Sequence, residues 1–519
     1  MNNVALELKN ITKRFGEVIA NNHVSLTVNR GEILALLGEN GSGKTSLMNV
    51  ISGIYYPEEG EIFVNGKSVQ IHSPKEAYDY HIGMIHQHYK LVDVFTATEN
   101  VVLGLSKEEY RQILNNPKAK FDLKEAAKRM KEIADSFDFH INPEQKVYSM
   151  SVSQKQTLEI LKVLFRGADI LILDEPTAVL TPQETKQLFK VLRNMKKAGK
   201  SIIIITHKLN EVMEISDRVS VLRKGEYIGT VNTSETNEAN LTEMMVGKKI
   251  DLNIQRKKPV NPKDRLIIEN LTINNGTRNV LDHVSFVAKS NEILGIAGIA
   301  GSGQKELLEA IAGLQNISEG KIEFIDDNQQ YIDLQTLNPG KIRELGISLS
   351  FVPEDRLGMG LVSTFDLVDN VMLRSYNKKD KKHLFTTNRK DPSSLTKNIV
   401  NDLQVVTPSL HTEIRKLSGG NVQKVLVGRE ISSHPRVLMA AYPVRGLDIN
   451  SSYLIYNLLM EQKENNAAVI YVGEDLDVLI DLCDRIVVLC DGKVSGIVDA
   501  YNISKEEIGL LMTKTGGEQ

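Results

Sequence analysis

The 519-residue sequence has few cysteines, no long apolar run and little net charge, and each shortage excludes a class of protein. Its two cysteines, Cys483 and Cys490, fall in an apolar segment, so we expect buried thiols rather than a disulfide or a metal pair. The longest apolar runs, such as Ile202–Ile205, are far too short to cross a membrane. Its 63 basic and 66 acidic side chains give a net charge of −3, which does not indicate a nucleic-acid-binding surface.

The remaining composition is that of a globular protein with more than one domain. Apolar residues make up 41% of the chain and charged residues 25%, which is typical of folded water-soluble domains. A chain of this length exceeds what one ordinary hydrophobic core accommodates. Residues 1–7 have neither a basic start nor an apolar stretch, so we expect no secretory signal and a cytosolic protein.

The stretch Gly38–Thr45 (GENGSGKT) matches the phosphate-binding pattern G-x-x-x-x-G-K-[ST] at every constrained position. The apolar run 33–37 before it is typical of a buried strand, and residues 46–51 can form a helix, which is the context this motif needs. An ordinary glycine-rich turn is the alternative, which this context disfavours. The loop's backbone N–H groups can wrap a phosphate, Lys44 can reach the outer phosphates and Thr45 can ligate Mg²⁺. The predicted phosphate-loop residues are Gly38, Glu39, Asn40, Gly41, Ser42, Gly43, Lys44, Thr45 and Ser46.

Two further apolar runs end in polar side chains that suit hydrolysis. Residues 169–177 read as a buried strand that ends in Asp174 and Glu175, and charge at such a place is costly unless it is needed. Asp174 can hold the Mg²⁺ shell, and Glu175 can orient or deprotonate an attacking water. The strand predicted at 201–205 brings His207 to the same edge, although a histidine at a strand end is often structural.

Two weaker candidates depend on their position in the chain. Phe15 could stack on an adenine, but a lone aromatic residue usually belongs to a core. Gln87 follows the apolar segment 82–85, and its amide could contact Mg²⁺ or water.

The chain contains one unit written twice. Residues 11–25 align without gaps to 271–285, and 38–43 align to 298–303, both at an offset of 260. Beyond an insertion of seven residues the offset becomes 267 and holds to the end of the second copy.

This repeat predicts two homologous α/β domains, 1–248 and 264–519, joined by a polar linker at 249–263. The charged, Ser/Thr-rich stretch 377–397 is expected to be an exposed excursion of the second domain.

In this order the motifs resemble those of an ATP-binding cassette (ABC) ATPase, namely Walker A, Q-loop, signature, Walker B, D-loop and H-loop. The resemblance covers both halves of the chain. It implies two tandem P-loop, RecA-like α/β domains, each with an antiparallel β-subdomain and a helical subdomain that carries the signature, at about 73–168 in the first copy. It also implies ATP and Mg²⁺ as ligands, and cassettes that pair head to tail, with each ATP between the Walker motifs of one and the signature of the other.

The second copy departs from this pattern at most of its nucleotide-contacting positions. Seven positions differ in residue type: Lys44 becomes Gln304, Thr45 becomes Lys305, Gln87 becomes Glu354, Asp174 becomes Ala441, Glu175 becomes Tyr442, His207 becomes Glu474 and Phe15 becomes Asn275. The signature is altered the other way, because the second copy has Leu417–Asn421 (LSGGN) where the first has Met150–Gln154 (MSVSQ). The second copy also has Asp448 in its D-loop, where the first has Thr181.

All intact parts would thus meet in one composite site, and we predict one hydrolytic site and one that is dead for hydrolysis. Two independent ATPases would require a carboxylate that Tyr442 cannot supply, and a purely structural subunit would not need Glu175. The resemblance assigns the following roles: catalysis to Glu175 and His207, metal binding to Thr45, Gln87 and Asp174, and ATP binding to Phe15, the phosphate loop, Gln87, Ser418, Gly419, Gly420 and Asp448.

Fused tandem cassettes of this size resemble bacterial importer ATPases for nucleosides and for monosaccharides. The stretches 159–184 and 440–448 favour the nucleoside branch, with the monosaccharide branch as the alternative. The resemblance implies two permease subunits, with a docking groove for a permease coupling helix at 88–92, and a solute-binding lipoprotein as an indirect partner. It also implies no nucleic acid and a peripheral place on the cytoplasmic face of the membrane. A ribosome-associated translation factor is the competing class, and the short linker and slightly acidic charge count against it.

Overall fold

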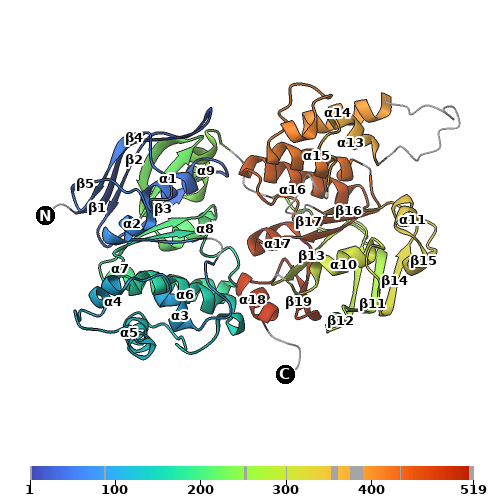
Figure 1. Ribbon diagram of the computed structural model, residues 1–519. Helices are drawn as coiled ribbons and strands as arrows, with labels where there is room; N and C mark the ends of the chain where they lie inside the picture. Colours follow the sequence, from blue (N-terminus) through green and yellow to red (C-terminus); the bar gives the residue numbers. More distant parts are fainter. Residues whose placement is uncertain are drawn as a thin grey trace. The chain divides into compact units, whose positions relative to one another are not determined.

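The structure is a computed structural model that describes residues 3–86, 89–249, 254–299, 301–351, 360–374, 390–432 and 434–513. The chain divides into two compact units, Met1–Asp251 and Leu252–Gln519 (Figure 1). Each unit is described below by itself. In the described part of the chain, every helix is too short or too polar to cross a membrane.

The first unit is built on a six-stranded sheet whose central strands run parallel. Four of these strands are buried along their whole length because helices and a second sheet cover both faces, as their apolar runs predict. The strands, in sheet order, are β10 (Glu226–Asn232), β9 (Arg218–Arg223), β3 (Ile33–Leu37), β8 (Ser201–Ile205), β7 (Ile170–Asp174) and β6 (Ile82–Ile85).

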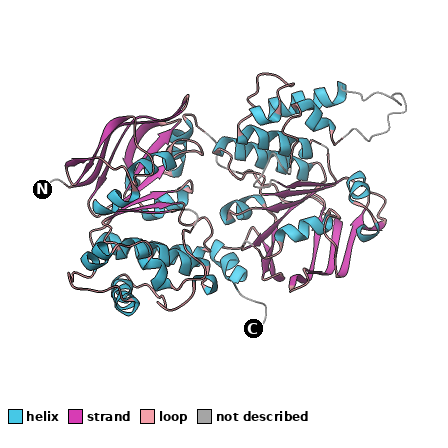
Figure 2. Ribbon diagram, in the orientation of Figure 1, coloured by secondary structure: helices cyan, strands magenta, loops and turns pink. Residues whose placement is uncertain are grey.

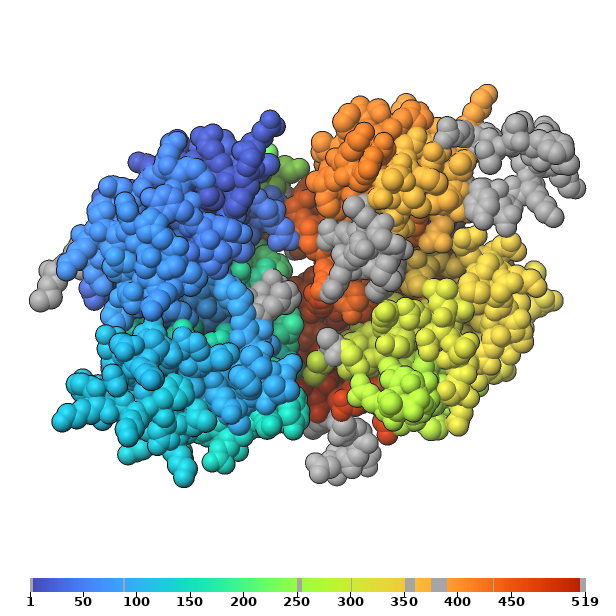
Figure 3. All heavy atoms as spheres, in the orientation of Figure 1, coloured from blue at the N-terminus to red at the C-terminus, as the bar shows by residue number. Residues whose placement is uncertain are grey.

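Two smaller subdomains complete the first unit, and the space-filling view shows them as the dark blue and light blue parts of its surface (Figure 3). One is an antiparallel sheet in the order β2 (Val18–Asn29), β1 (Val4–Phe15), β4 (Glu59–Val64) and β5 (Lys67–Val69). The other is helical and comprises α3 (Ala97–Val102), α4 (Lys107–Ile113), α5 (Leu123–Ser136) and α6 (Val152–Phe165). The other helices are α1 (Lys44–Ile51), α2 (Pro74–Asp79), α7 (Pro182–Lys197), α8 (Leu209–Ile215) and α9 (Glu238–Val246).

The second unit repeats this architecture (Figure 2). Its main sheet has the order β16 (Ile347–Phe351), β17 (Val437–Ala441), β18 (Ala468–Val472), β13 (Glu292–Gly298), β19 (Arg485–Cys490) and β20 (Lys493–Asp499). Its antiparallel sheet has the order β12 (Asn279–Lys289), β11 (Asp264–Asn274), β14 (Glu319–Ile325) and β15 (Tyr331–Asp333). Its helices include α10 (Gln304–Ile311), α11 (Pro339–Glu344), α13 (Leu367–Met372), α14 (Lys390–Asp402), α15 (Gly419–Ile431), α16 (Ile449–Glu464), α17 (Leu476–Leu482) and α18 (Lys505–Thr513). The predicted fold class is confirmed.

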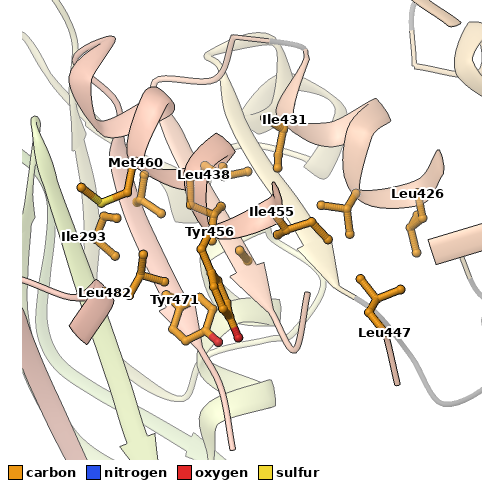
Figure 4. Packing of buried hydrophobic residues seen from close by; sticks show 14 of the residues in the cluster. Ile293, Leu426, Ile431, Leu438, Leu447, Ile455, Tyr456, Met460, Tyr471 and Leu482 are labelled. Carbon is orange, nitrogen blue, oxygen red and sulfur yellow. The ribbon is translucent and has the colours of Figure 1, made fainter. Parts of the chain in front are cut away.

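The core of the second unit contains two buried tyrosines, Tyr456 and Tyr471, packed edge to face among aliphatic side chains (Figure 4). Both cysteines are free and buried, as expected. Cys483 belongs to this core, where burial raises the pKa of its thiol well above the ordinary value. A group with such a pKa is inert as a nucleophile at neutral pH.

Strand pairing shows that the extra residues of the second unit are not one insertion. Ile82 and Ile347 pair with equivalent residues of the neighbouring strand and are 265 positions apart. Asn100 and Asn370 make the same loop contacts and are 270 positions apart. Several insertions, and a later deletion, therefore combine into the final offset of 267.

A buried ion pair in the second unit has a half-exposed counterpart in the first. Lys463 Nζ lies 2.8 Å from Asp484 Oδ1, with both side chains 3% exposed, whereas Lys196 and Asp217 lie 2.5 Å apart and are 35% and 36% exposed. The difference arises because the segment before β11 covers Lys463, whose ammonium donates to the carbonyl of Lys257. Tyr501 also donates to Asp484.

This difference predicts unequal costs for the same substitution. Lys463→Met leaves the Asp484 carboxylate buried without its cation and should cost about 3 kcal/mol, or a fall of roughly 6–12 °C in Tm. Lys196→Met removes a solvated partner and should cost no more than about 1 kcal/mol. Differential scanning calorimetry of the two variants measures both values, and equal losses would contradict the explanation.

Candidate active site

The phosphate loop joins the end of β3 to the start of α1. Gly43 lies immediately before α1 with φ 95°, and a Cβ there would come within 2.2 Å of the carbonyl oxygen of Ala20. Only glycine fits this position, for reasons of both conformation and space. Gly41 also has positive φ, and a Cβ there would meet open space, so its conformation alone requires glycine.

Lys44 is buried beneath this loop. Its ammonium donates to the carbonyls of Gly38 at 2.7 Å and Glu39 at 2.9 Å. Burial lowers the pKa of Lys44, and the nearby carboxylates of Glu175 and Asp174 oppose that shift. The charge therefore depends on the two carboxylates at the end of β7.

Asp174 lies at the end of β7, with the Thr45 hydroxyl 3.5 Å from its Oδ2. Burial, with the neighbouring charge of Glu175, raises the pKa of Asp174 to about 6. A hydroxyl and a carboxylate are hard oxygen ligands of the kind Mg²⁺ uses together with substrate phosphates. Among the described residues no group of three or more His, Cys, Asp or Glu side chains could hold a metal alone, so phosphate oxygens would have to complete the shell.

Glu175 follows with φ 46°, a left-handed conformation that is rare for a residue with a side chain. Its backbone N–H donates to the carbonyl of Ile205 at the end of β8, which holds the turn. Its Oε1 lies 3.0 Å from His207 Nδ1, and this hydrogen bond, stronger than the opposing effect of burial, lowers the pKa of Glu175. The ends of three neighbouring strands, β3, β8 and β7, thus bring Lys44, His207, Asp174 and Glu175 together.

Two residues near the loop carry unpaired buried atoms. Ser42 Oγ and Asn21 Oδ1 have no hydrogen-bond partner, although the Asn21 amide nitrogen donates to the carbonyl of Gly43. An unpaired buried hydroxyl in a phosphate loop is consistent with a ligand that supplies its partner. Asn21 is not among the residues predicted from the sequence, where its only signal is its replacement by Leu281 in the repeat.

Phe15 lies at the turn between β1 and β2 and is 44% exposed. Tyr55 packs against it edge-on, with ring centroids 5.1 Å apart, and the Lys13 ammonium lies 5.4 Å from its centroid. The ring is braced and open to solvent, which suits a stacking surface. In the second unit, Asn275 instead accepts hydrogen bonds from the N–H groups of Thr277 and Arg278 within its own turn.

The second unit keeps the shape of the phosphate loop without its buried lysine. Gly303 has φ 98° before α10, and Gln304 donates to the carbonyl of Ile299, the counterpart of the bond from Lys44 to Glu39. Tyr442 keeps the left-handed φ of Glu175, at 52°. Neither Ala441 nor Tyr442 can bind a metal as a carboxylate does.

Comparison with known proteins identifies the family of the chain. The ABC transporter family model matches residues 21–178 and 281–443. The chain belongs to the ABC transporter family. It is therefore an ATP-binding ATPase of a transport system, as the sequence predicted.

Three relatives align over nearly the whole ABC chain. A guanosine import ATP-binding protein of Bacillus subtilis is 42% identical over 98% of this chain and 97% of its own. A nucleoside import ATP-binding protein of Lactococcus lactis is 39% identical over 98% of both. A glucose import ATP-binding protein of Haloferax volcanii is 38% identical over 98% and 96%. An archaeal ribosome recycling factor, 14% identical with a TM-score of 0.58 over 92% and 87%, shares the fold.

Each of the two ABC signatures lies at the start of a helix, and the two helices differ in how their N-termini are capped. In α6, Ser151 accepts from the N–H of Gln154 while the Gln154 side chain accepts from the N–H of Ser151, a closed capping box. In α15, Ser418 makes no such cap and its hydroxyl accepts from the Asn421 side chain. The α15 terminus therefore presents backbone N–H groups that an anion can bind.

Asp448 and Thr181 occupy equivalent capping positions. Asp448 caps α16 by accepting from the N–H and hydroxyl of Ser451, and Thr181 caps α7 in a capping box with Glu184. Capping accounts for either residue, so this difference does not distinguish the two sites. Gln87, His88 and Glu354 lie outside the described residues.

Lys44→Gln places the residue of the second unit in the first and isolates the role of the charge. The loop should keep its shape, because Gln304 already makes the equivalent bond. ATP affinity should fall roughly 10- to 100-fold, the value of a charge-assisted hydrogen bond. Titration with a fluorescent ATP analogue measures it, with Gln304→Ala as the control expected to leave this affinity within about twofold. Unchanged affinity in Lys44→Gln would contradict the role.

Proposed function

We propose that this chain is the ATP-hydrolysing subunit of a nucleoside importer, with one competent site. The observation that carries the proposal is the group of Lys44, Asp174, Glu175 and His207 in the first unit alone. The guanosine and nucleoside import relatives at 42% and 39% identity support the substrate class. Monosaccharide import is the second candidate, favoured by the glucose import relative at 38%.

The proposed site combines the Walker residues of the first unit with Ser418, Gly419 and Gly420 of the second. Two features support it: the uncapped start of α15, and the replacement of the buried Lys44 by Gln304 in the other phosphate loop. Gln87 and Phe15 belong to the competent site in this proposal. The other site would combine the phosphate loop of the second unit with the signature of the first. It would not hydrolyse ATP, because α6 is capped and the second unit lacks both strand-end carboxylates.

The residues divide the work of hydrolysis. Lys44 and the loop amides would hold the outer phosphates, while Thr45 and Asp174 would hold Mg²⁺, which neutralises phosphate charge. Because its pKa is lowered, Glu175 stays ionised at neutral pH and is a weak base, which suits orienting the attacking water more than removing its proton beforehand. His207 holds Glu175 in place through the bond to Oε1 and can contact the terminal phosphate.

The importer assembly would place this chain peripherally on the cytoplasmic face of the membrane. Two permease subunits would dock on segments that include Tyr89–Val92, and a solute-binding lipoprotein outside would deliver the nucleoside to them. Closure of the cassettes on ATP and reopening after hydrolysis would switch the permease between its two access states.

Glu175→Gln should lower ATP turnover at least about 100-fold while ATP still binds, because the amide cannot act on water as the carboxylate does. Release of phosphate and retention of labelled ATP measure the two effects. Tyr442→Ala is the matched control at the equivalent position and should leave turnover within about twofold, since Tyr442 has no catalytic part. Retained hydrolysis in Glu175→Gln would refute the one-site proposal.

Uptake of labelled nucleosides and sugars by cells that lack this protein tests the substrate class. We expect nucleoside uptake to fall and to return with the wild-type chain but not with Glu175→Gln. Loss of monosaccharide uptake alone would favour the second candidate, and ribosome co-sedimentation without membrane association would favour a translation factor.

A further inference from the structure

The segment Lys90–Val92 of the first unit is held in place by side chains. The N–H of Lys90 donates to Glu159 Oε1 at 2.8 Å, and the Lys162 ammonium donates to the carbonyl of Lys90 at 2.9 Å. The N–H of Val92 donates to Asn100 Oδ1 at 2.7 Å, and the Asn100 amide nitrogen donates to the carbonyl of Val92 at 3.1 Å. Four backbone groups of an irregular segment, two on Lys90 and two on Val92, are thus paired with side chains from two helices.

The contacts to Lys90 come from one face of α6, the helix that begins at the altered signature. Glu159 is 4% exposed, and the side chain of Lys162, three residues later, is 16% exposed and lies 3.8 Å from its carboxylate. Gln156, three residues earlier, accepts from the Tyr89 hydroxyl at 3.1 Å. Residues three apart share a helix face, so α6 contacts this segment over about two turns.

Burying a carboxylate is costly unless it is paired and hydrogen-bonded, and Glu159 is both. The cost indicates a specific role for this side chain. A leucine would fill the same place without a charge, and the second unit has one.

The second unit lacks one part of this arrangement. Asn370 pairs with both backbone groups of Val362 just as Asn100 does with Val92. Arg429, the counterpart of Lys162, donates to the carbonyl of Gly360. At the position of Glu159 stands Leu426, which belongs to the apolar cluster and has no acceptor atom (Figure 4).

We infer that Glu159 and Lys162 are positioning residues that latch the Tyr89–Val92 segment to α6, and that among the described residues the Glu159 part of this latch belongs to the first unit alone. The latch makes the segment and the helix move as one body. Resting on the proposed function, it transmits force between a permease docked on this segment and the helical subdomain. The Asn100 contacts, common to both units, serve the local loop fold, whereas the Glu159 contact is specific to the unit with the hydrolytic residues.

Glu159→Leu tests the latch with the residue that the second unit already contains, so folding is expected to survive. Glu159→Gln is the matched control, because its carbonyl oxygen still accepts from the Lys90 N–H. Hydrogen–deuterium exchange with residue-resolved mass spectrometry on the full chain should show the Lys90 amide at least tenfold faster in Glu159→Leu. The Val92 amide should be unchanged, and Glu159→Gln should resemble the wild type.

The same variants test transmission in cells. Glu159→Leu should lower labelled nucleoside uptake at least tenfold, while ATP hydrolysis by the isolated chain stays within twofold of the wild-type rate. Glu159→Gln should support uptake like the wild type. Unchanged Lys90 exchange in Glu159→Leu would overturn the latch, and faster exchange with wild-type uptake would overturn its role in transmission. If wild-type chain supports no uptake, the proposed function fails, and the exchange data alone decide whether the latch exists.

Discussion

The buried ammonium group of Lys44 is the interaction on which the first site depends. It lies beneath the phosphate loop beside Asp174 and Glu175, so its positive charge offsets the burial of the two carboxylates, whose mutual repulsion raises the pKa of Asp174. Losing Lys44 alone would leave two carboxylates without their cation, and losing both carboxylates would leave a buried ammonium unpaired, and breaking such a pairing typically costs about 3–5 kcal/mol. This explains why the second unit lacks all three: replacing only the carboxylates would have stranded the lysine, whereas Gln304, Ala441 and Tyr442 together leave no unpaired charge.

The backbone geometry of the site does not depend on these charges. Tyr442 keeps the left-handed conformation of Glu175, and its N–H donates to Val472 as that of Glu175 donates to Ile205. Parallel strand pairing and the glycine turn set this geometry, so a chemically inactive copy retains it. The backbone geometry of the second unit is consequently no evidence that it hydrolyses ATP, because the side chains determine whether it can.

The fold and the strand-end residues were predictable because their signals are local. Unbroken apolar runs, a glycine-rich turn and a repeat identify the strands that carry Asp174, Glu175 and His207 without knowledge of distant contacts. Asn21, which donates to Gly43, and Glu159, which binds Lys90, depend on elements that only the folded chain brings together. Asp448 has a second role that the sequence did not indicate, because its carboxylate caps α16.

The two units therefore differ in which polar groups at their signature helices already have hydrogen-bond partners. At the start of α6 the amides are occupied by the box of Ser151 and Gln154, so a phosphate would have to displace bonds worth about 1 kcal/mol each. At the start of α15 no such side-chain cap exists, and an anion would gain bonds without losing any. At the phosphate loops the first unit is the better suited to bind an anion, since Lys44 offers a charge and Gln304 does not. The first unit therefore has the charged loop, and the second has the uncapped helix terminus.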